Sequence, residues 1–233
     1  MNSKEETSIR LSGSFETSTY GVLLRDSLMH ALAIDTKVPD WIVKMPGMSG
    51  KKYRYLINFL IEKIENARYL EVGSWAGSTA CSAMSGNIVT ALCVDDWSLF
   101  GGPKNEFDEN VKKVLTDQIK FSFIEQDFRK INYQNIGKFN VYLFDGPHEE
   151  KDQFDGVVIA QPALDDQYIL LVDDFNWLAV RQGTFGALKA LGAKVECSIE
   201  IRTTQDNTHP SLLIKENSDW HNGYFMAVCR KNI

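Results

Sequence analysis

The sequence has few cysteines, no strongly basic segment and no long apolar run. Its 233 residues include 4 cysteines that lie far apart without C-x-x-C spacing, so we expect reduced, structural thiols. The net charge is −6 and no Lys/Arg cluster is interleaved with aromatic residues, which argues against a nucleic-acid partner. The polar N-terminus lacks a signal-peptide core, and no run of about 18 apolar residues follows it. We therefore expect a cytoplasmic protein with no membrane partner.

Two glycine signatures of nucleotide-binding proteins are also missing. The absence of G-x-G-x-x-G disfavours NAD, and the absence of G-K-S/T excludes a P-loop. What is present is "RYLEVGSWAGSTACSA" at 68–83, where a strand-like run passes into a helix-like run through Gly73 and Gly77. Glycines at such a position let the backbone approach a ligand closely. The pair alone fits a structural tight turn equally well.

The chain divides into a polar N-terminal segment and a longer part with a regular apolar pattern. Residues 1–18 are rich in Ser, Thr and Glu and predict a flexible N-terminal arm. Residues 19–233 are expected to form a single domain, since 44% of the whole sequence is hydrophobic and its length suits one core. The arm could wrap around a second subunit or cover an active site, so a homo-oligomer remains open.

An alternation of strands and helices predicts an α/β fold. Apolar runs suited to strands occur at 68–72, 89–94, 121–125, 139–144 and 168–172. The segments between these runs are long enough for crossover helices, which indicates a parallel sheet covered on both faces. The last two strand-like runs, 193–203 and 223–231, are joined only by a polar loop, so we expect them to form an antiparallel hairpin.

Acidic residues stand where predicted strands end. Asp95 and Asp96 end the strand-like run "VTALCVDDW", where a carboxylate can accept hydrogen bonds from both hydroxyls of a ribose. Asp127 ends "FSFIEQDF", a suitable position for contacting an adenine amino group. One acid at a strand end is common by chance, whereas acids at successive strand ends beside a glycine turn indicate a nucleotide-like ligand.

This combination resembles the class I S-adenosylmethionine-dependent methyltransferases over about residues 45–233. "LEVGSWAGS" is similar to their E/D-x-G-x-x-x-G motif, "VDDW" to the strand that carries their ribose-binding acid, and "EQDF" to the one that carries their adenine-binding acid. The resemblance implies a Rossmann-like three-layer sandwich whose mostly parallel sheet has seven strands and ends in an antiparallel hairpin. It also implies S-adenosylmethionine as cofactor, with the binding residues Glu71, Gly73, Ser74, Trp75, Gly77, Asp95, Asp127 and Met48.

Within that set the resemblance assigns separate roles. Glu71 is expected to hold the cofactor loop, Gly73 and Gly77 to flank the methionine part, Asp95 to bind the ribose and Asp127 to bind the adenine. Asp96 could take the place of Asp95. Met48 and Gly50 belong to "MPGMSG", which is similar to a loop that closes over the methionine end, although these residues also suit a plain turn.

The fourth and fifth predicted strands carry groups suited to catalysis. "VYLFDGPHEE" places Asp145 at a strand end with His148 three residues later, and "YILLVDDFNW" ends in Asp173 and Asp174. Carboxylates that lie so close together repel one another unless they bind a shared cation. Oxygen ligands suit Mg²⁺ or another divalent cation. Such an ion orients a hydroxyl and lowers its pKa. The alternative is that one aspartate caps a helix and another is solvated.

These residues resemble the metal-dependent small-molecule O-methyltransferases of the catechol and macrolide-sugar types. The resemblance implies a metal held by Asp145, Asp173 and Asp174, and catalytic roles for His148 and Asp145. Catechol enzymes have a lysine at the position of His148. A histidine suits proton removal from a bound hydroxyl because it titrates near neutral pH, although a lone loop histidine more often satisfies a backbone group.

The expected function is methyl transfer from S-adenosylmethionine to a hydroxyl of a small molecule, such as a sugar or another hydroxylated metabolite. Further candidates near the acceptor are Trp97, Trp177, Arg181 and, in the polar loop 203–213, His209. Three alternatives stay open: a metal-independent methyltransferase, a nucleotide-binding oxidoreductase, and a non-catalytic binding protein on a Rossmann-like scaffold.

Overall fold

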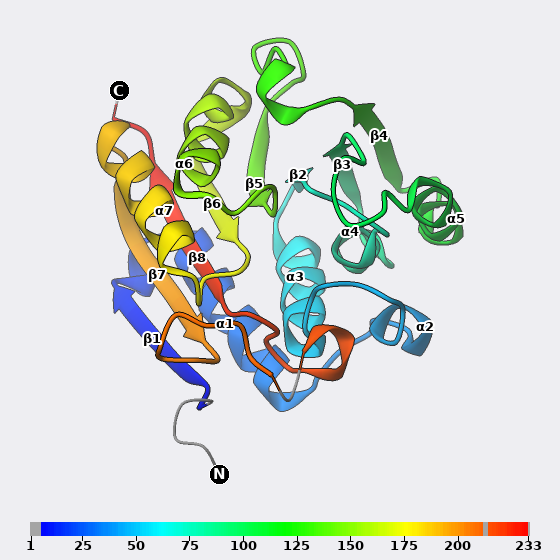
Figure 1. Cartoon of the computed structure of the whole chain (residues 1–233), viewed down its shortest axis with the longest axis horizontal. Coiled ribbons are helices and arrows are strands. Elements are labelled where there is room, and N and C mark those ends of the chain that lie inside the picture. Colours follow the sequence, from blue (N-terminus) through cyan, green and yellow to red (C-terminus); the bar gives the residue numbers. More distant parts are fainter. Residues whose placement is uncertain (1–5, 212–213, 233) are drawn as a thin grey trace.

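The computed structural model describes residues 6–211 and 214–232, and these form one mixed sheet whose strand order is β1-β7-β8-β6-β5-β2-β3-β4 (Figure 1). Its strands are β1 (Ser8–Gly13), β2 (Arg68–Val72), β3 (Val89–Asp95), β4 (Ile119–Glu125), β5 (Phe139–Phe144), β6 (Leu164–Val172), β7 (Lys194–Arg202) and β8 (Tyr224–Arg230). Strands β2 to β6 are parallel, and β8 is antiparallel to both β6 and β7. The expected parallel sheet with its terminal hairpin is confirmed.

Helices cover both faces of the sheet and make it the middle of three layers (Figure 1). They are α1 (Thr19–Ala33), α2 (Asp40–Val43), α3 (Lys51–Lys63), α4 (Ser78–Met84), α5 (Lys104–Val114), α6 (Glu150–Ile159) and α7 (Leu178–Ala190), with short 3-10 turns η1 (Phe15–Thr17), η2 (Phe128–Lys130), η3 (Gln161–Ala163) and η4 (Lys215–Asn217). Alternate strand residues enter two cores: Tyr69 belongs to the core that includes residues of α1, α3, α4 and α5, whereas Leu70 belongs to the core that includes residues of α6 and α7. The Rossmann-like architecture is confirmed.

The expected count of seven strands is wrong, because the N-terminal segment adds an eighth. Ser8 to Gly13 of the predicted flexible arm pair antiparallel with β7, from Ser8 opposite Arg202 to Gly13 opposite Cys197. The pairing covers the outer edge of β7, which would otherwise leave a row of unpaired backbone groups. These six residues are therefore part of the sheet, and residues 1–5 of the predicted arm lie outside the described residues.

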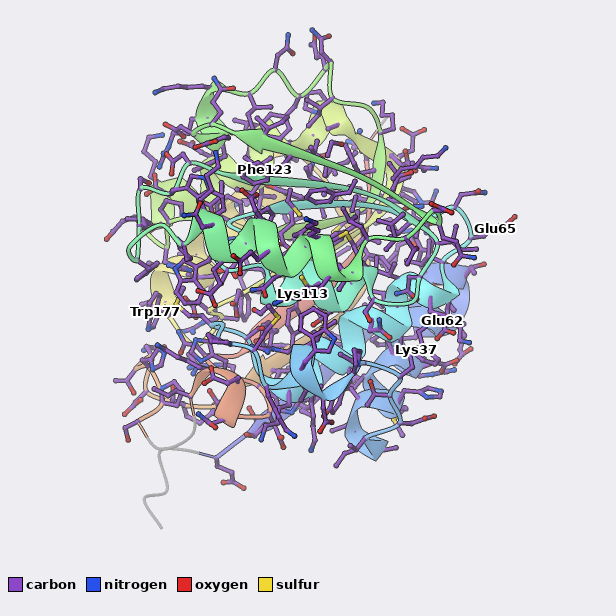
Figure 2. The ribbon with its side chains drawn as sticks, turned by 90° about the vertical axis from the view of Figure 1, so that its right-hand side faces the viewer. Lys37, Glu62, Glu65, Lys113, Phe123 and Trp177 are labelled. Carbon is purple, nitrogen blue, oxygen red and sulfur yellow. The ribbon has the colours of Figure 1, made fainter. Side chains whose placement is uncertain are left out.

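The chain direction brings the ends of the parallel strands to one side of the molecule. In Figure 2, Trp177, which follows β6, lies at the opposite end of the molecule from Glu65, which precedes β2. The chain runs outward from β2 to β3 and β4 and then returns to β5 beside β2. Such a switch point opens a crevice beyond the carboxyl ends of the strands.

The long connection between β7 and β8 turns back toward this crevice. Lys51 N donates to Ser218 O at 2.8 Å and Lys52 N to Asp219 O at 3.0 Å, so the connection is joined to the first turn of α3. No helix in the described part of the chain is long and apolar enough to cross a membrane. The four cysteines are free and buried, as expected for structural thiols: Cys81, Cys93, Cys197 and Cys229.

Candidate active site

One cavity at the carboxyl ends of the parallel strands collects most of the residues singled out from the sequence. Those that line it are Met48, Gly73, Ser74, Trp75, Asp95, Asp127, Asp145, His148, Asp173 and Asp174. Glu71 and Gly77 are behind this lining, since Glu71 is 1% exposed within β2 and Gly77 packs against Phe107. The structure thus brings the predicted cofactor residues and the predicted catalytic residues to the same cavity.

The turn after β2 needs its glycines. Gly73 has a φ of +88°, and a Cβ atom there would lie 1.8 Å from the backbone oxygen of Asp145. Gly77 has a φ of +85°, and its Cβ atom would lie 3.0 Å from the Phe107 ring. Trp75 between them also has a positive φ, 44°. The turn therefore folds tightly against the end of β5 and sets the cofactor side of the cavity beside Asp145.

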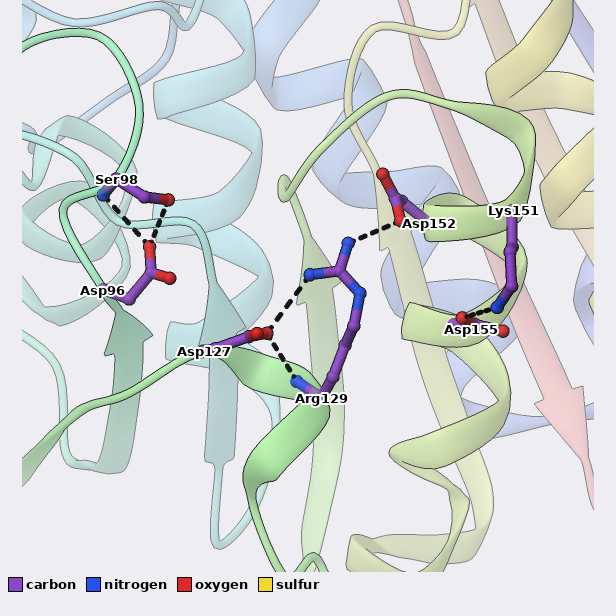
Figure 3. Close-up of polar contacts among 7 residues, drawn as sticks. All are labelled: Asp96, Ser98, Asp127, Arg129, Lys151, Asp152 and Asp155. Atoms are coloured by element: carbon purple, nitrogen blue, oxygen red, sulfur yellow. Dashed lines mark hydrogen bonds and ion pairs between the residues drawn. The ribbon is translucent and has the colours of Figure 1, made fainter.

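Asp95 is held in place by the backbone on both of its oxygens. Oδ2 accepts a hydrogen bond from Trp75 N and Oδ1 accepts one from Trp97 N, both at 2.8 Å. Each carboxylate oxygen retains a further lone pair with which to accept from a ligand. Asp96 is exposed, and its Oδ1 accepts from the amide and hydroxyl of Ser98 (Figure 3). Both acids line the cavity, and Asp95 is the one held by two backbone amides.

Asp127 lies on the cavity rim with a basic neighbour that the sequence did not single out. Its Oδ1 accepts from Arg129 N at 3.0 Å and from the Arg129 guanidinium at 3.2 Å (Figure 3). The same guanidinium pairs with Asp152 of α6 and lies 4.4 Å from the Phe128 ring centroid. Arg129 also lines the cavity. In the sequence, its position two residues after Asp127 was the feature that could have identified Arg129 as a cavity residue.

His148 forms the centre of an acid–imidazole cluster. Its Nε2 lies 2.8 Å from Asp174 Oδ2 and 3.7 Å from Asp145 Oδ1. Asp174 has a positive φ of 55°, and its backbone N donates to Asp173 Oδ1 at 2.8 Å. Within residues 6–211 and 214–232 no three His, Cys, Asp or Glu side chains are grouped so that they could hold a metal ion. In this arrangement the His148 ring is the partner of Asp174 and lies near Asp145, and the metal site at Asp145, Asp173 and Asp174 stays a prediction.

The cluster shifts the ionisation of its members. Burial lowers the pKa of His148, but hydrogen bonds and charge from Asp145 and Asp174 outweigh burial and raise that pKa to about 10. Burial raises the pKa of Asp145 to about 6 and, with the charge of Asp145, raises the pKa of Asp173 well above its usual range. For Asp174 the His148 partner outweighs burial and lowers the pKa. At neutral pH the cluster therefore contains a His148–Asp174 ion pair beside Asp173, whose raised pKa favours its protonated form.

Two buried polar atoms below the glycine turn lack partners. Tyr69 donates to Glu71 Oε2, and burial raises the pKa of Glu71 to about 8. Glu71 Oε1 and the hydroxyl of Ser74 are buried without a hydrogen-bond partner in the part of the chain that is described. Such groups are nearly always satisfied in folded proteins. Of the two residues only Ser74 lines the cavity, so its hydroxyl is the one available to a ligand there.

Aromatic and imidazole rings form the opposite wall. Ring centroids are 5.0 Å apart for His148 and Trp177, 6.2 Å for Trp177 and His209, and 5.0 Å for His209 and His221. The three rings of Trp177, His209 and His221 line the cavity, as the sequence proposed for Trp177 and His209. Residues 212–213 of the predicted loop lie outside the described residues. His221 was missed because no motif surrounds it.

The His221 ring has a defined tautomer. Lys215 N donates to His221 Nδ1 at 2.9 Å, so Nδ1 carries a lone pair and, in the neutral ring, Nε2 carries the hydrogen. Burial lowers the pKa of His221 to about 4, which keeps the ring neutral at physiological pH. His221 N also donates to the Ser218 hydroxyl at 2.7 Å. The cavity wall thus contains a neutral, rigidly held N–H donor.

Two other candidates have structural positions. Arg181 donates to Phe175 O at 2.9 Å and also contacts Asn176 O and Asn207, and it does not line the cavity. It therefore ties together the segments after β6 and β7 rather than pairing with an acceptor. Trp97 packs with its ring centroid 5.4 Å from that of Phe123, so it belongs to the core edge rather than to the cavity lining.

Comparisons with known proteins were made at the level of sequence and of structure. No protein-family model matches the sequence, and no curated protein matches it significantly. The structure resembles the S-adenosylhomocysteine-bound O-methyltransferase of Bacillus cereus, with 14% identity, 90% of this chain and 91% of that chain covered, and a TM-score of 0.51. It also resembles a protein of Pyrococcus horikoshii described as a candidate RNA methyltransferase. The identity is 13%, the match covers 93% of this chain and 100% of that chain, and the TM-score is 0.53.

The fold is that of the class I methyltransferases. TrmN of Thermus thermophilus is also similar, with 16% identity and a TM-score of 0.50, but the match covers 77% of this chain and 49% of that chain. The chain thus spans about half the length of TrmN. The matched proteins share a fold with this chain, and the residues of the cavity must decide between functions.

Proposed function

We propose that the protein transfers a methyl group from S-adenosylmethionine to a hydroxyl oxygen of a small molecule. The observation that carries this proposal is the position of Asp95, fixed by two backbone amides, in the same cavity as the His148–Asp174 pair. The Bacillus cereus O-methyltransferase, which has the same fold, was solved with the demethylated cofactor. A ligand-binding acid and a proton acceptor in one cavity are the two parts that such a reaction needs.

The cofactor half of the cavity matches the parts of S-adenosylmethionine. Asp95 offers two acceptor oxygens for the ribose hydroxyls, and Asp127 stands at the rim for the adenine. Ser74 offers an unpartnered hydroxyl for the amino-acid portion, Met48 lines the same cavity, and Glu71 supports the turn from behind the lining. Bound there, the cofactor would supply an electrophilic methyl group on a cationic sulfur.

The acceptor half of the cavity contains the group that would remove the hydroxyl proton. Neutral His148 accepts the proton as the new C–O bond forms, and Asp174 at 2.8 Å stabilises the resulting imidazolium. In the ligand-free protein His148 has a pKa of about 10 and is already protonated. A cation in the cavity lowers that pKa by like-charge repulsion and favours the neutral form required for catalysis.

We favour a metal-independent reaction, since His148, rather than a cation, is the partner of Asp174 at 2.8 Å. The second candidate is the metal-dependent reaction that the resemblance implied. One observation favours it: Asp174 Oδ1 is buried without a hydrogen-bond partner among the described residues, beside Asp145 and Asp173. Activity that survives chelation with EDTA supports the first candidate, and activity restored only by Mg²⁺ supports the second.

A small acceptor suits the charges better than a polyanion does. The chain has a net charge of −6, and aspartates dominate the cavity lining. An RNA acceptor would need a basic surface along its backbone, which the sequence lacks. A nicotinamide oxidoreductase would need the missing G-x-G-x-x-G turn, and a non-catalytic binding protein would have no use for the His148 cluster.

The first experiment is calorimetric titration with S-adenosylhomocysteine, with and without Mg²⁺, on the wild type, Asp95→Ala and the matched control Asp96→Ala. We expect micromolar binding that Asp95→Ala weakens at least 100-fold and Asp96→Ala leaves within about threefold. Screening of hydroxylated metabolites for methyl transfer follows. Absence of binding under both conditions would overturn the proposed function.

A further inference from the structure

Arg54 is a fully buried cation whose partners in the described part of the chain include no carboxylate. Its Nη1 donates to the backbone oxygens of Ile42 at 2.7 Å, Val43 at 3.2 Å and Met45 at 2.9 Å. The side chain is 0% exposed, and burial lowers its pKa to about 10, so it remains charged at neutral pH. A buried charge held only by dipoles favours a nearby anion.

A chain of hydrogen bonds connects Arg54 to the cavity. Arg54 Nε donates to Ser49 Oγ at 3.0 Å, and Ser49 Oγ lies 3.1 Å from Ser78 Oγ. Because the guanidinium can only donate, the Ser49 hydroxyl accepts from it and is polarised to donate onward to Ser78. That arrangement leaves the Ser78 hydroxyl hydrogen free to point elsewhere. Ser78 lines the cavity, whereas Arg54 and Ser49 do not.

Gly47 makes the close approach of these groups possible. A Cβ atom on Gly47 would lie 2.2 Å from Ser78 Oγ and 2.9 Å from Arg54 Nη2. Arg54 Nη2 also donates to Gly47 O at 3.5 Å. The segment around Met48 is thus folded closely over the guanidinium and the Ser78 hydroxyl. The fold therefore fixes the position of the Arg54 guanidinium relative to the cavity.

We propose that Arg54 is a positioning residue that acts through Ser49 and Ser78 to make this end of the cavity selective for a carboxylate. The inference rests on the proposed function, and the carboxylate is that of the amino-acid portion of S-adenosylmethionine. Arg129, the arginine that lines the cavity, is already paired with Asp127 and Asp152 at the proposed adenine side. The aspartates that line the rest of the cavity repel a carboxylate, so the cofactor carboxylate is best accommodated at the Ser78 end.

The test compares two probes that differ only in the carboxylate. S-adenosylhomocysteine carries it, and S-adenosyl-3-thiopropylamine lacks it but keeps the amine. By calorimetry, we expect the wild type to bind the first at least tenfold more tightly. We expect Ser49→Ala to reduce this ratio about tenfold while affinity for the amine probe changes less than twofold, since the bonds of Arg54 to backbone oxygens remain.

The matched control is Ser82→Ala, which removes a buried serine of α4 whose hydroxyl donates to Ser78 O at 2.7 Å. It should leave the ratio unchanged. Arg54→Met is expected to lower the melting temperature because four carbonyl oxygens lose their donor. If this variant folds, its ratio of affinities for the two probes should equal that of Ser49→Ala and that of the double variant Ser49→Ala/Arg54→Met.

The outcomes separate the two proposals. If the wild type binds neither probe, the proposed function fails and this inference fails with it. If the wild type binds both probes equally, or if Ser49→Ala weakens both equally, the cofactor assignment stands and the role of Arg54 is overturned. A selective loss for the carboxylate-bearing probe supports the inference even where Arg54→Met does not fold.

Discussion

The two halves of the cavity are held in place in different ways. On the cofactor side, backbone groups position the key side chain, since Trp75 N and Trp97 N bind Asp95 across the glycine turn. On the acceptor side, side chains position one another, and the His148–Asp174 pair depends on the charges of both groups. We infer that the cofactor half tolerates changes of pH better and changes of backbone geometry worse than the acceptor half.

The largest effect should come from a change that disrupts both halves at once. In Gly73→Ala the new Cβ would lie 1.8 Å from Asp145 O, so the turn and the end of β5 must separate. We expect a loss of roughly 2–4 kcal/mol in the free energy of unfolding and at least 100-fold weaker binding of S-adenosylhomocysteine. Urea unfolding and calorimetry measure the two effects.

The control for Gly73→Ala is Gly101→Ala. Gly101 also has a positive φ, +81°, but no atom of the described residues lies within 4 Å of the position that a Cβ atom would occupy there. Only backbone strain of about 1 kcal/mol is expected at this position. Equal losses in the two variants would show that positive φ alone, rather than contact with Asp145, explains the requirement for glycine at position 73.

The next effect separates the halves. His148→Gln removes the proton acceptor but leaves Asp95 and the glycine turn intact, so methyl transfer should fall at least 100-fold while S-adenosylhomocysteine binds within about threefold of wild type. Transfer is measured with an acceptor from the metabolite screen. A parallel loss of cofactor binding would show that the two halves are not independent.

The contrast between the halves also explains how far the sequence could predict the site. Asp95 and the glycine turn were predictable because strand ends and turn residues impose their geometry locally. The His148–Asp174 pair was not, because its 2.8 Å separation depends on side-chain packing across two strands, and the carboxylates alone suggested a metal. Arg54 was missed because a charged residue in a helical pattern usually faces solvent, and only the tertiary fold buries it.

The fold shows the same division between local and long-range information. Five parallel strands and the terminal hairpin followed from apolar runs and connection lengths. β1 was missed because "SIRLSG" is short and polar, with Ile9 and Leu11 as its only apolar residues, and its pairing partner β7 lies almost the whole chain away. Local composition suggested an arm, while the unpaired edge of β7 determined its structure.

The third prediction concerns pH, to which the acceptor half should be the more sensitive. His148 must be neutral to accept a proton, so kcat/KM for S-adenosylmethionine, which reports the ligand-free enzyme, should rise about tenfold per pH unit while pH remains below the folded-state pKa of about 10. His148→Gln should give a flat profile. A flat wild-type profile from pH 6 to 9 would rule out His148 as the base.

The same shift makes a prediction for stability. The pKa of His148 rises from an ordinary value of 6.5 to about 10 on folding, so the protonated pair stabilises the fold fully below pH 6.5 and loses that contribution as pH rises through 10. The free energy of unfolding of the wild type should therefore exceed that of His148→Gln by less at pH 10.5 than at pH 6.5. Urea titrations at these two pH values check the sign, and a constant difference would contradict it.

The smallest effect should appear at the ring wall, where a single neutral donor is tested. His221→Phe keeps a planar ring but removes the Nε2 donor and the Nδ1 acceptor that Lys215 N uses. We propose that His221 Nε2 donates to the acceptor without taking part in proton transfer. We therefore expect KM for the acceptor to rise about tenfold, with kcat and cofactor affinity nearly unchanged. His209→Phe is the control on the neighbouring, more exposed ring, and it should change KM less than threefold. If kcat fell instead, His221 would act on the reacting hydroxyl, and the acceptor half would contain two proton-handling imidazoles rather than one.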